Sequence, residues 1–148
     1  MTTCSDVMTT NPTCCVSTDT VERAAQMMKA EDVGSIPVVE SQNTKRLVGI
    51  VTDRDLVLKV LAAGPNGHDQ AVGDVMTHDP VACRERDDLN KALQAMSDHQ
   101  VRRIPIVNDQ HEVVGIVAQA DIATRTEQPH KTAGVVEDIS KPNTKVTR

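Results

Sequence analysis

The strongest constraint in this sequence is an internal repeat. Residues 5–39 align with residues 73–107 at an offset of 68, and 14 of these 35 aligned positions carry the same residue. The alignment continues at an offset of 66 beyond a polar loop, which has seven residues in the first copy (40–46) and five in the second (108–112). Because the register is kept on both sides of a loop-length change, the repeat predicts a duplicated structural unit.

Each copy predicts a short extended segment followed by an amphipathic helix. The extended segments follow the first proline of each copy, at 13–16 and 81–83. Asp19 and Asp87 are the expected N-caps of the two helices. In each helix four apolar residues have the i, i+3, i+4, i+7 spacing of a single buried stripe. These residues are Val21, Ala24, Ala25 and Met28 in the first copy and Leu89, Ala92, Leu93 and Met96 in the second.

Two strands and a second helix complete each copy as a β-α-β-β-α unit. The strands are expected at 36–39 and 47–51 in the first copy, and at 104–107 and 113–117 in the second. The second helix of each copy begins near Asp53 or Gln119. One such unit is too small to bury a sheet face alone, so the two copies are expected to pack together.

The repeat also predicts the domain organisation. The first repeat is expected at 5–62, a linker at 63–73 and the second repeat at 74–125. The remaining segment, 126–148, is expected to form a short docked helix around Val135, Val136 and Ile139, followed by a loose tail.

Composition excludes several classes of function. The 148 residues include no Phe, Trp or Tyr, so there are no aromatic platforms for single-stranded nucleic acid. A net charge of −5 disfavours nucleic-acid phosphates, and the apolar runs are too short to span a membrane. With no export signal visible, we expect a cytoplasmic protein. The cysteines are expected to be small buried thiols, because neither they nor the histidines have metal-ligand spacing; they are Cys4, Cys14, Cys15 and Cys83.

The same motifs stand in the same order in both copies. They are a D-V-M-T opening, an I-P-V-V or I-P-I-V strand, and a G-I-V-x-x-x-D turn from strand to helix. Over residues 5–125 this arrangement closely resembles a tandem CBS-domain pair, also called a Bateman module. The resemblance implies an α/β fold of two CBS repeats packed as a pseudo-two-fold pair, with small sheets flanked by helices. The chain looks like a stand-alone CBS pair rather than the regulatory part of an enzyme.

The turn that contains Thr52, Arg54 and Asp55 is the best candidate for a nucleotide site. A helix N-terminus offers free N–H groups and the positive end of the helix dipole to a phosphate, and Thr52 and Arg54 add donors. The resemblance assigns Thr52 and Asp55 to the phosphate and ribose of a ligand. Thr-x-x-Asp is also the pattern of a capping box, and this alternative stays open.

The second copy departs from this pattern. Its turn reads Ala118-Gln119-Ala120-Asp121, which keeps the acidic residue but has no hydroxyl and no cation. A neutral hydrogen bond contributes about 1 kcal/mol and a charged one about 1.5–3 kcal/mol. We therefore expect the second site to be weaker.

The resemblance also implies where an adenine base would lie. The base would contact the segment after the first proline and the I-P strand of each copy, with backbone groups of Cys14 or Ala82 reading its edge. The alternative for the two isoleucines is an ordinary core position, and both can hold, because one face of the side chain can line a slot while the other packs in the core. The implied residues are Thr13, Cys14, Cys15, Ile36 and Pro37 for one site, and Val81, Ala82, Ile104 and Pro105 for the other.

Arg102 and Arg103 stand immediately before the second I-P strand. Arginines that enter a buried strand are costly unless they meet an anion. The resemblance implies that they point into the central cleft towards ligand phosphates. A surface pair bonded to Asp98 or Asp109 is the alternative.

These features favour a non-catalytic sensor of adenine-containing ligands such as AMP, ADP, ATP, NAD or S-adenosylmethionine. Binding in the cleft between the repeats would change the geometry of a homodimer or of a protein effector. The alternative is a ligand-free scaffold with vestigial clefts, which the missing hydroxyl at Ala118 favours. No nucleophile–base pair or phosphate-binding glycine loop points to an enzyme.

Overall fold

The computed structural model describes residues 1–125, which form two compact units. Residues 13–80 make up one unit, and residues 1–12 together with the described residues from 81 onward make up the other. Within this described part no helix is long and apolar enough to cross a membrane.

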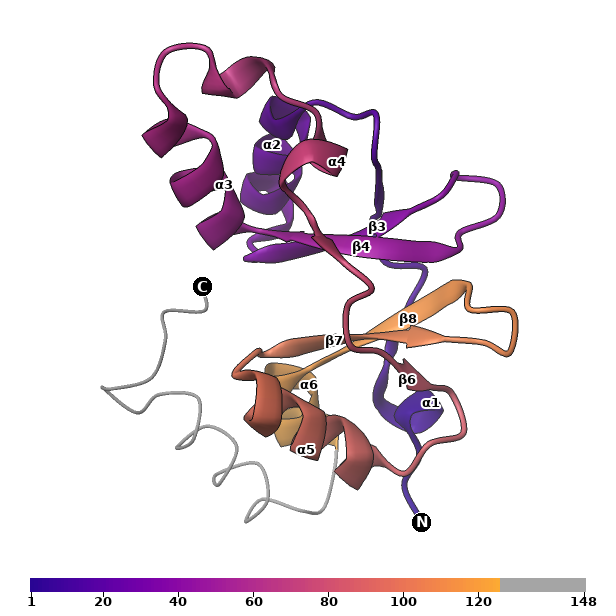
Figure 1. The fold of residues 1–148 in the computed structure, drawn as a ribbon. Helices are drawn as coiled ribbons and strands as arrows, with labels where there is room; N and C mark the ends of the chain where they lie inside the picture. The colour runs from indigo at the N-terminus through magenta and orange to yellow at the C-terminus, as the bar shows by residue number, and fades with distance from the viewer. Residues whose placement is uncertain (126–148) are drawn as a thin grey trace. The chain divides into compact units, whose positions relative to one another are not determined.

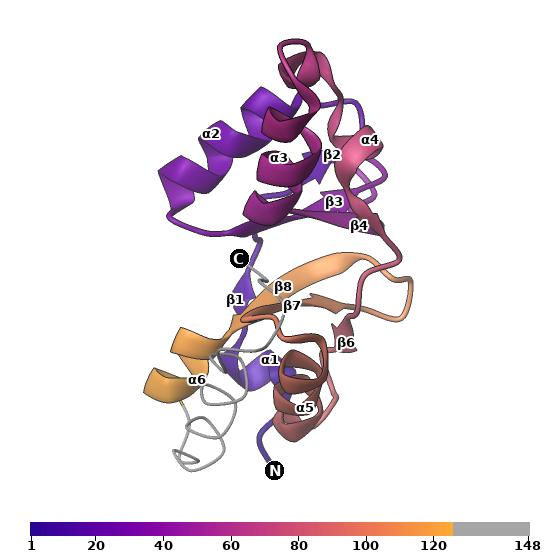
Figure 2. The same cartoon turned by 60° about the vertical axis from the view of Figure 1, so that its left-hand side comes forward.

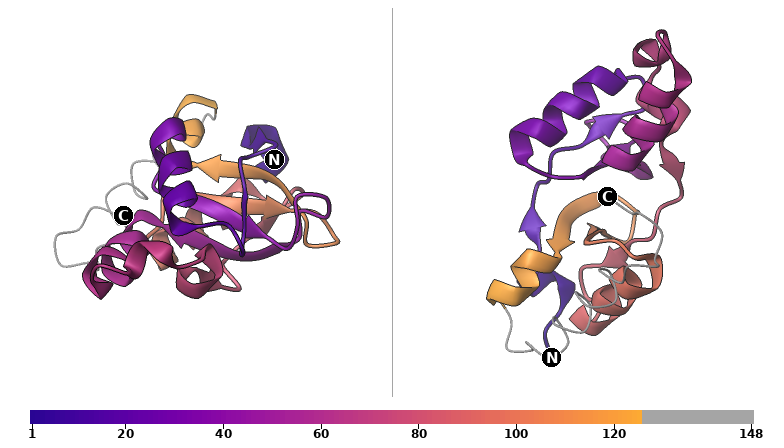
Figure 3. Two further views of the ribbon diagram at one scale, coloured as in Figure 1. Left: turned by 90° about the horizontal axis from the view of Figure 1, so that it is seen from above. Right: turned by 90° about the vertical axis from the view of Figure 1, so that its left-hand side faces the viewer.

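The unit of residues 13–80 is a four-stranded sheet with helices on one face (Figures 1 and 3). Its strand order is β2-β3-β4-β5, with β2 parallel to β3 and the other pairs antiparallel. Its strands are β2 (Cys15–Val16), β3 (Ser35–Val39), β4 (Leu47–Thr52) and β5 (Thr77–His78). Its helices are α2 (Val21–Glu31), α3 (Asp53–Lys59), η1 (Leu61–Ala63), η2 (Gly67–Asp69) and α4 (Val72–Val75).

The other unit repeats this plan (Figure 2). Its strand order is β1-β8-β7-β6, with β6 parallel to β7 and the other pairs antiparallel. Its strands are β1 (Thr9–Thr10), β6 (Cys83–Arg84), β7 (Arg103–Val107) and β8 (Val113–Ala118). Its helices are α1 (Cys4–Val7), α5 (Leu89–His99) and α6 (Gln119–Arg125). The predicted α/β class, with two small sheets flanked by helices, is confirmed.

The opening of each repeat folds into the unit that holds the rest of the other repeat. Strand β1 pairs with β8, Thr9 lying opposite Ile116, and β5 pairs with β4, His78 lying opposite Gly49. The compact units are therefore divided after residues 12 and 80, whereas the predicted boundaries follow the sequence repeat. The predicted helix and tail at 126–148 lie outside the described residues.

The predicted helix N-caps are wrong by one residue. Thr20 caps α2 by accepting a hydrogen bond from Arg23 N (3.1 Å), and Asp88 caps α5 through Asn90 N (2.9 Å). Asp19 accepts instead from Val16 N (3.0 Å), and the equivalent Asp87 accepts from Arg84 N (2.7 Å). Each of these carboxylates closes the turn between a strand and the helix that follows it.

Each unit has its own hydrophobic core cluster, to which valine and isoleucine contribute. Both helices bury most of the predicted stripe, with Ala25 as the exception: it is exposed, and Val21, Ala24 and Met28 carry the packing. In α5 all four predicted residues are buried. The cysteines are all free and buried, as expected.

Candidate functional site

The Thr52–Asp55 turn forms the capping box that was the alternative to a ligand role. Thr52 Oγ1 accepts from Asp55 N (3.1 Å), and Asp55 Oδ2 accepts from Thr52 N (3.0 Å). The box fixes the junction between β4 and α3. It also holds Asp55 in place with only 8% of its surface exposed. Since the Thr52 hydroxyl acts here as an acceptor, its own proton remains able to donate to a ligand oxygen.

Lys59 is a further member of this site. Its ammonium lies 3.2 Å from Asp55 Oδ1 and donates to the carbonyl oxygen of Val75 (3.0 Å), which joins α3 to α4. Asp55 and Lys59 are four residues apart on one helix, so this ion pair could have been predicted from the sequence alone. The carboxylate is thereby oriented from both sides, and each oxygen keeps a further lone pair.

The prediction that the N–H groups at the start of α3 are free is wrong. Asp53 N donates to the carbonyl oxygen of Gly34 (2.9 Å), and Arg54 N donates to Asp53 Oδ1 (2.8 Å). The third group, Asp55 N, belongs to the capping box. The Asp53 carboxylate occupies the position where a bound anion would be stabilised by the positive end of the helix dipole. Of the groups predicted to contact a phosphate, this leaves the Thr52 hydroxyl and the Arg54 side chain, which is exposed.

The sheet register brings the predicted residues of this unit to one end. Ser35 lies opposite Thr52, and Ile36 lies opposite Val51. Strand β2 runs parallel to β3 with Cys15 opposite Val38, so the segment leading into β2 lies beside the first half of β3. The candidate phosphate, ribose and base contacts of this repeat thus share one end of one sheet.

The predicted base-binding side chains serve mainly as core. Ile36 is 1% exposed within the core cluster, and Pro37 is buried, so the alternative of a core position is confirmed for Ile36. Cys15 is also buried, and its sulfur contacts that of Met27 (3.6 Å). At this end of the sheet, the atoms that an adenine base could contact are therefore mainly backbone atoms.

The segment before Cys15 is already hydrogen-bonded. The carbonyl oxygen of Cys14 accepts from Gln42 Nε2 (3.0 Å), and the exposed Thr13 hydroxyl donates to Glu31 (3.2 Å).

The second candidate site lies in the other unit and is built differently. Asp121 Oδ2 accepts a long hydrogen bond from the Thr9 hydroxyl (3.4 Å), which comes from β1 at the start of the chain. Gln119 Oε1 is buried without a partner among the described residues, and Gln119 N donates to the Arg102 carbonyl (2.9 Å). No sequence signal links Thr9 to Asp121, because they are 112 residues apart.

The remaining predicted residues of this unit also share one end of its sheet. Arg103 lies opposite Ala118 in the β7–β8 pair, and Ile104 is fully buried in the core cluster, which confirms the core alternative for it. Pro105 is buried, and the segment of Val81 and Ala82 that leads into β6 is half-buried.

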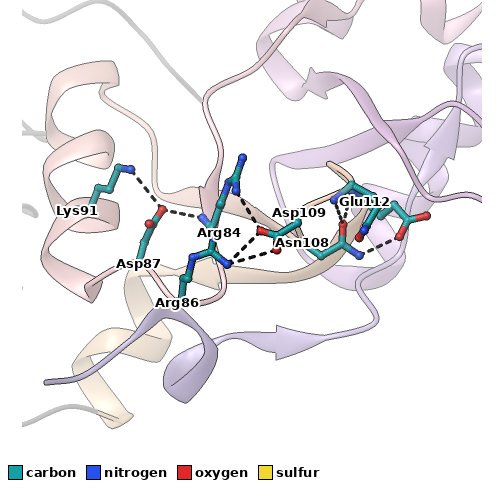
Figure 4. A network of polar contacts seen from close by, with 8 residues as sticks. Arg84, Arg86, Asp87, Lys91, Asn108, Asp109 and Glu112 are labelled. Carbon is teal, nitrogen blue, oxygen red and sulfur yellow. Dashed lines mark hydrogen bonds and ion pairs between the residues drawn. The ribbon is translucent and has the colours of Figure 1, made fainter.

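The two arginines differ in exposure. Arg102 is exposed and Arg103 is half-buried, and their contact with a ligand stays a prediction. Asp109, one of the suggested surface partners, is contacted by Arg84 (3.0 Å) and Arg86 (3.1 Å), as Figure 4 shows. A hollow of about 300 Å³ adjoins this network at the other end of β7. Over residues 1–125 no group of three or more acidic, His or Cys side chains is placed to hold a metal ion.

The buried thiol of Cys15 makes stability depend on pH. Burial, aided by nearby Asp19, raises the pKa of Cys15 from 9.0 to about 11. The unfolded chain then loses this proton first, so the folded state binds more protons between these values and stability falls as pH rises. We expect a loss of about 2 kcal/mol from pH 8 to pH 11.

Urea unfolding followed by circular dichroism, at both pH values, measures this loss. The matched variant Cys15→Ala is less stable at pH 8 because it leaves a small cavity, but it lacks the titrating group. The stability difference between wild type and variant should therefore shrink towards pH 11. A constant difference would assign the alkaline loss to other groups.

The chain is similar to a known family, to curated proteins and to solved structures. The family model of the CBS domain matches residues 4–62 and 72–126. Hypoxic response protein 1 of Mycobacterium tuberculosis is 35% identical over 142 residues, which cover 96% of both chains. The crystal structure of Hypoxic Response Protein I with two coordinated zinc ions has a TM-score of 0.75 at 36% identity, covering 84% of this chain and 99% of that chain.

Two further solved structures contain adenine-based ligands. The CBS domain pair of MJ0100 in complex with 5′-methylthioadenosine and S-adenosyl-L-methionine has a TM-score of 0.71 at 26% identity, and the match covers 84% of this chain and 94% of that chain. CBSX2 of Arabidopsis thaliana in complex with AMP has a TM-score of 0.74 at 25% identity, with coverage of 88% and 99%.

Proposed function

The chain belongs to the CBS-domain family, and from that premise we propose that it is a non-catalytic sensor of an adenine-containing ligand. The Thr52–Asp55 turn carries this proposal. Its hydroxyl proton is available to a phosphate or ribose oxygen, its carboxylate is held ready for ribose hydroxyls, and the Arg54 side chain is exposed beside them. The ligands of MJ0100 and CBSX2 share the adenosine group that this turn would recognise.

The two repeats would bind such a ligand unequally. In the unit of residues 13–80 the ribose would meet an oriented carboxylate and a hydroxyl. In the other unit Asp121 faces the Thr9 hydroxyl at 3.4 Å, and position 118 offers only a methyl group. The difference of one or two hydrogen bonds, about 1 kcal/mol each, makes the first site the stronger one.

A homodimer is part of this proposal. The surface of α3 and η1 exposes large apolar side chains, which fit a contact with a second copy; they are Val57 (51%), Leu58 (50%) and Leu61 (74%). Ligand binding would act on the dimer, or on a protein effector, by favouring one of two arrangements.

A thermal-shift panel tests the proposal. Protein freed of nucleotides is heated with a reporter dye in the presence of AMP, ADP, ATP, NAD or S-adenosylmethionine. A ligand at 100 times its dissociation constant adds about 2.7 kcal/mol and raises the melting temperature by several degrees. We expect such a shift for at least one of them. No shift with any of the five would favour the scaffold function.

A further inference from the structure

Two buried thiols, those of Cys4 and Cys83, meet in the core of the unit that contains the N-terminal segment. Cys4 is 0% exposed and Cys83 is 2% exposed, and both belong to one hydrophobic cluster. Each thiol shifts the pKa of the other, and backbone bonds from Cys4 N to the Asp87 carbonyl and from Ser5 N to the Glu85 carbonyl (both 2.9 Å) hold this segment beside the turn that follows Cys83. Cys4 belongs to α1 and Cys83 to β6, so this contact joins the start of the chain to the second repeat.

The sequence repeat provides an internal control for this contact. At the offset of 68 residues, Cys83 corresponds to Cys15 and Cys4 corresponds to Val72. The backbone agrees with this correspondence: Cys4 N donates to the carbonyl oxygen of Asp87 (2.9 Å), and Val72 N donates to that of Asp19 (2.8 Å). Val72 is fully buried. A valine therefore satisfies the packing at this position, and the repeated fold does not need a thiol there.

We propose that Cys4 and Cys83 form a reversible disulfide by exchange with a low-molecular-weight disulfide such as glutathione disulfide. The Cys83 thiolate attacks one sulfur of glutathione disulfide, which forms a mixed disulfide and releases one glutathione thiolate. The Cys4 thiolate then attacks the Cys83 sulfur, closes the Cys4–Cys83 bond and releases the second glutathione thiolate. The protein gives up two electrons and two protons, and one glutathione disulfide becomes two glutathione thiols.

The contact between the thiols makes them unequally acidic. Hydrogen bonding with Cys4 lowers the pKa of Cys83, whereas the same interaction and burial raise the pKa of Cys4. Cys83 is therefore the more readily ionised thiol while the segment is in place; once the segment has opened either thiolate can attack first, and the products are the same.

The reagent gains access when the N-terminal segment opens. This segment is attached through the two-residue strand β1, the four-residue helix α1 and a few backbone bonds, among them Ser5 N to the carbonyl oxygen of Glu85 (2.9 Å). The disulfide would fix this segment in place, and with it the Thr9 hydroxyl that contacts Asp121.

Thiol counting on the full chain tests the proposal. After treatment with glutathione disulfide, a chromogenic thiol reagent in denaturant should find two thiols per chain in place of four. Cyanogen bromide cleaves after methionine, so it separates Cys4 (peptide 2–8) from Cys14 and Cys15 (peptide 9–27) and from Cys83 (peptide 77–96). Peptides 2–8 and 77–96 should be joined until reduction. The closed loop should raise the melting temperature by roughly 10 °C.

Three variants serve as controls. Cys4→Val copies the other repeat and should form no protein disulfide; it should lose at most one of its three thiols, to a mixed disulfide between Cys83 and glutathione, and Cys4→Ser should behave in the same way if the valine variant fails to fold. Cys14→Ser should still lose two thiols. The proposal is overturned if wild type keeps four thiols, if the link involves peptide 9–27, or if glutathione stays attached to Cys83 without a link to Cys4.

Discussion

Replacing Gly67 with alanine lowers the free energy of unfolding by about 3 kcal/mol. A Cβ atom on Gly67 would clash with the carbonyl oxygen of Val60 and lie 2.9 Å from its carbonyl carbon. That carbonyl belongs to the main chain and already accepts a hydrogen bond from Ala63 N (3.2 Å). It cannot turn away without disrupting the turn between α3 and η2, so the backbone itself must shift.

Urea unfolding followed by circular dichroism measures this effect, and Gly34→Ala is the matched control. A Cβ atom on Gly34 would meet the tip of the Asp53 carboxylate at 3.0 Å, and a side chain can move aside. The control should cost less than about 1 kcal/mol. Equal losses for the two variants would show that the close approach of Gly67 to Val60 is relieved at little cost.

Gly67 also shows a limit of prediction from sequence patterns. In the sequence it is the last residue of a Gly-Pro-Asn-Gly stretch and predicts a turn, which η2 and its neighbours form. The sequence does not show that this glycine is needed for a close approach rather than for a positive φ. In the same stretch Gly64 has a φ of +102° and no atom within 4 Å of its Cβ position. The two glycines are thus required for different reasons.

The elements with a long periodic signal were predictable from the sequence. The 11-residue helices α2 and α5 and the β3–β4 and β7–β8 hairpins follow from apolar spacing and from the repeat. The edge strands β1 and β5 were not predictable. Two residues carry no periodicity, and their partners are set by the tertiary fold, so each opening joins the sheet of the other repeat.

The candidate site was predictable in its residues but not in its hydrogen bonding. The Thr-x-x-Asp pattern marked the turn, and the register of β3 and β4 brings Ile36 near it. Whether the N–H groups at the start of α3 are free depends on the Gly34 carbonyl and on the rotamer of Asp53, neither of which a pattern encodes.

Replacing Asp55 with asparagine weakens adenosine-ligand binding by roughly 100-fold while the helix cap stays in place. The amide oxygen of asparagine can still accept from Thr52 N, as Asp55 Oδ2 does at 3.0 Å. Two ribose hydroxyls, however, lose a charged acceptor worth about 1.5 kcal/mol each, and 1.4 kcal/mol corresponds to a factor of ten. Titration calorimetry with whichever of AMP or S-adenosylmethionine raises the melting temperature measures the change, and circular dichroism confirms the fold.

The variant Lys59→Met distinguishes a direct contact of Asp55 with the ribose from an effect of the Asp55–Lys59 ion pair. This variant removes the ammonium that lies 3.2 Å from Asp55 Oδ1 but leaves the carboxylate and the capping box. Because the lysine is half-exposed, its pair with Asp55 contributes at most about 1 kcal/mol, and affinity should change less than fivefold. Asp121→Asn, in the other unit, should change it less than tenfold, since that turn lacks the hydroxyl. If Lys59→Met weakened binding as much as Asp55→Asn, Asp55 would act by positioning α3 and α4, and the ribose contact would be wrong.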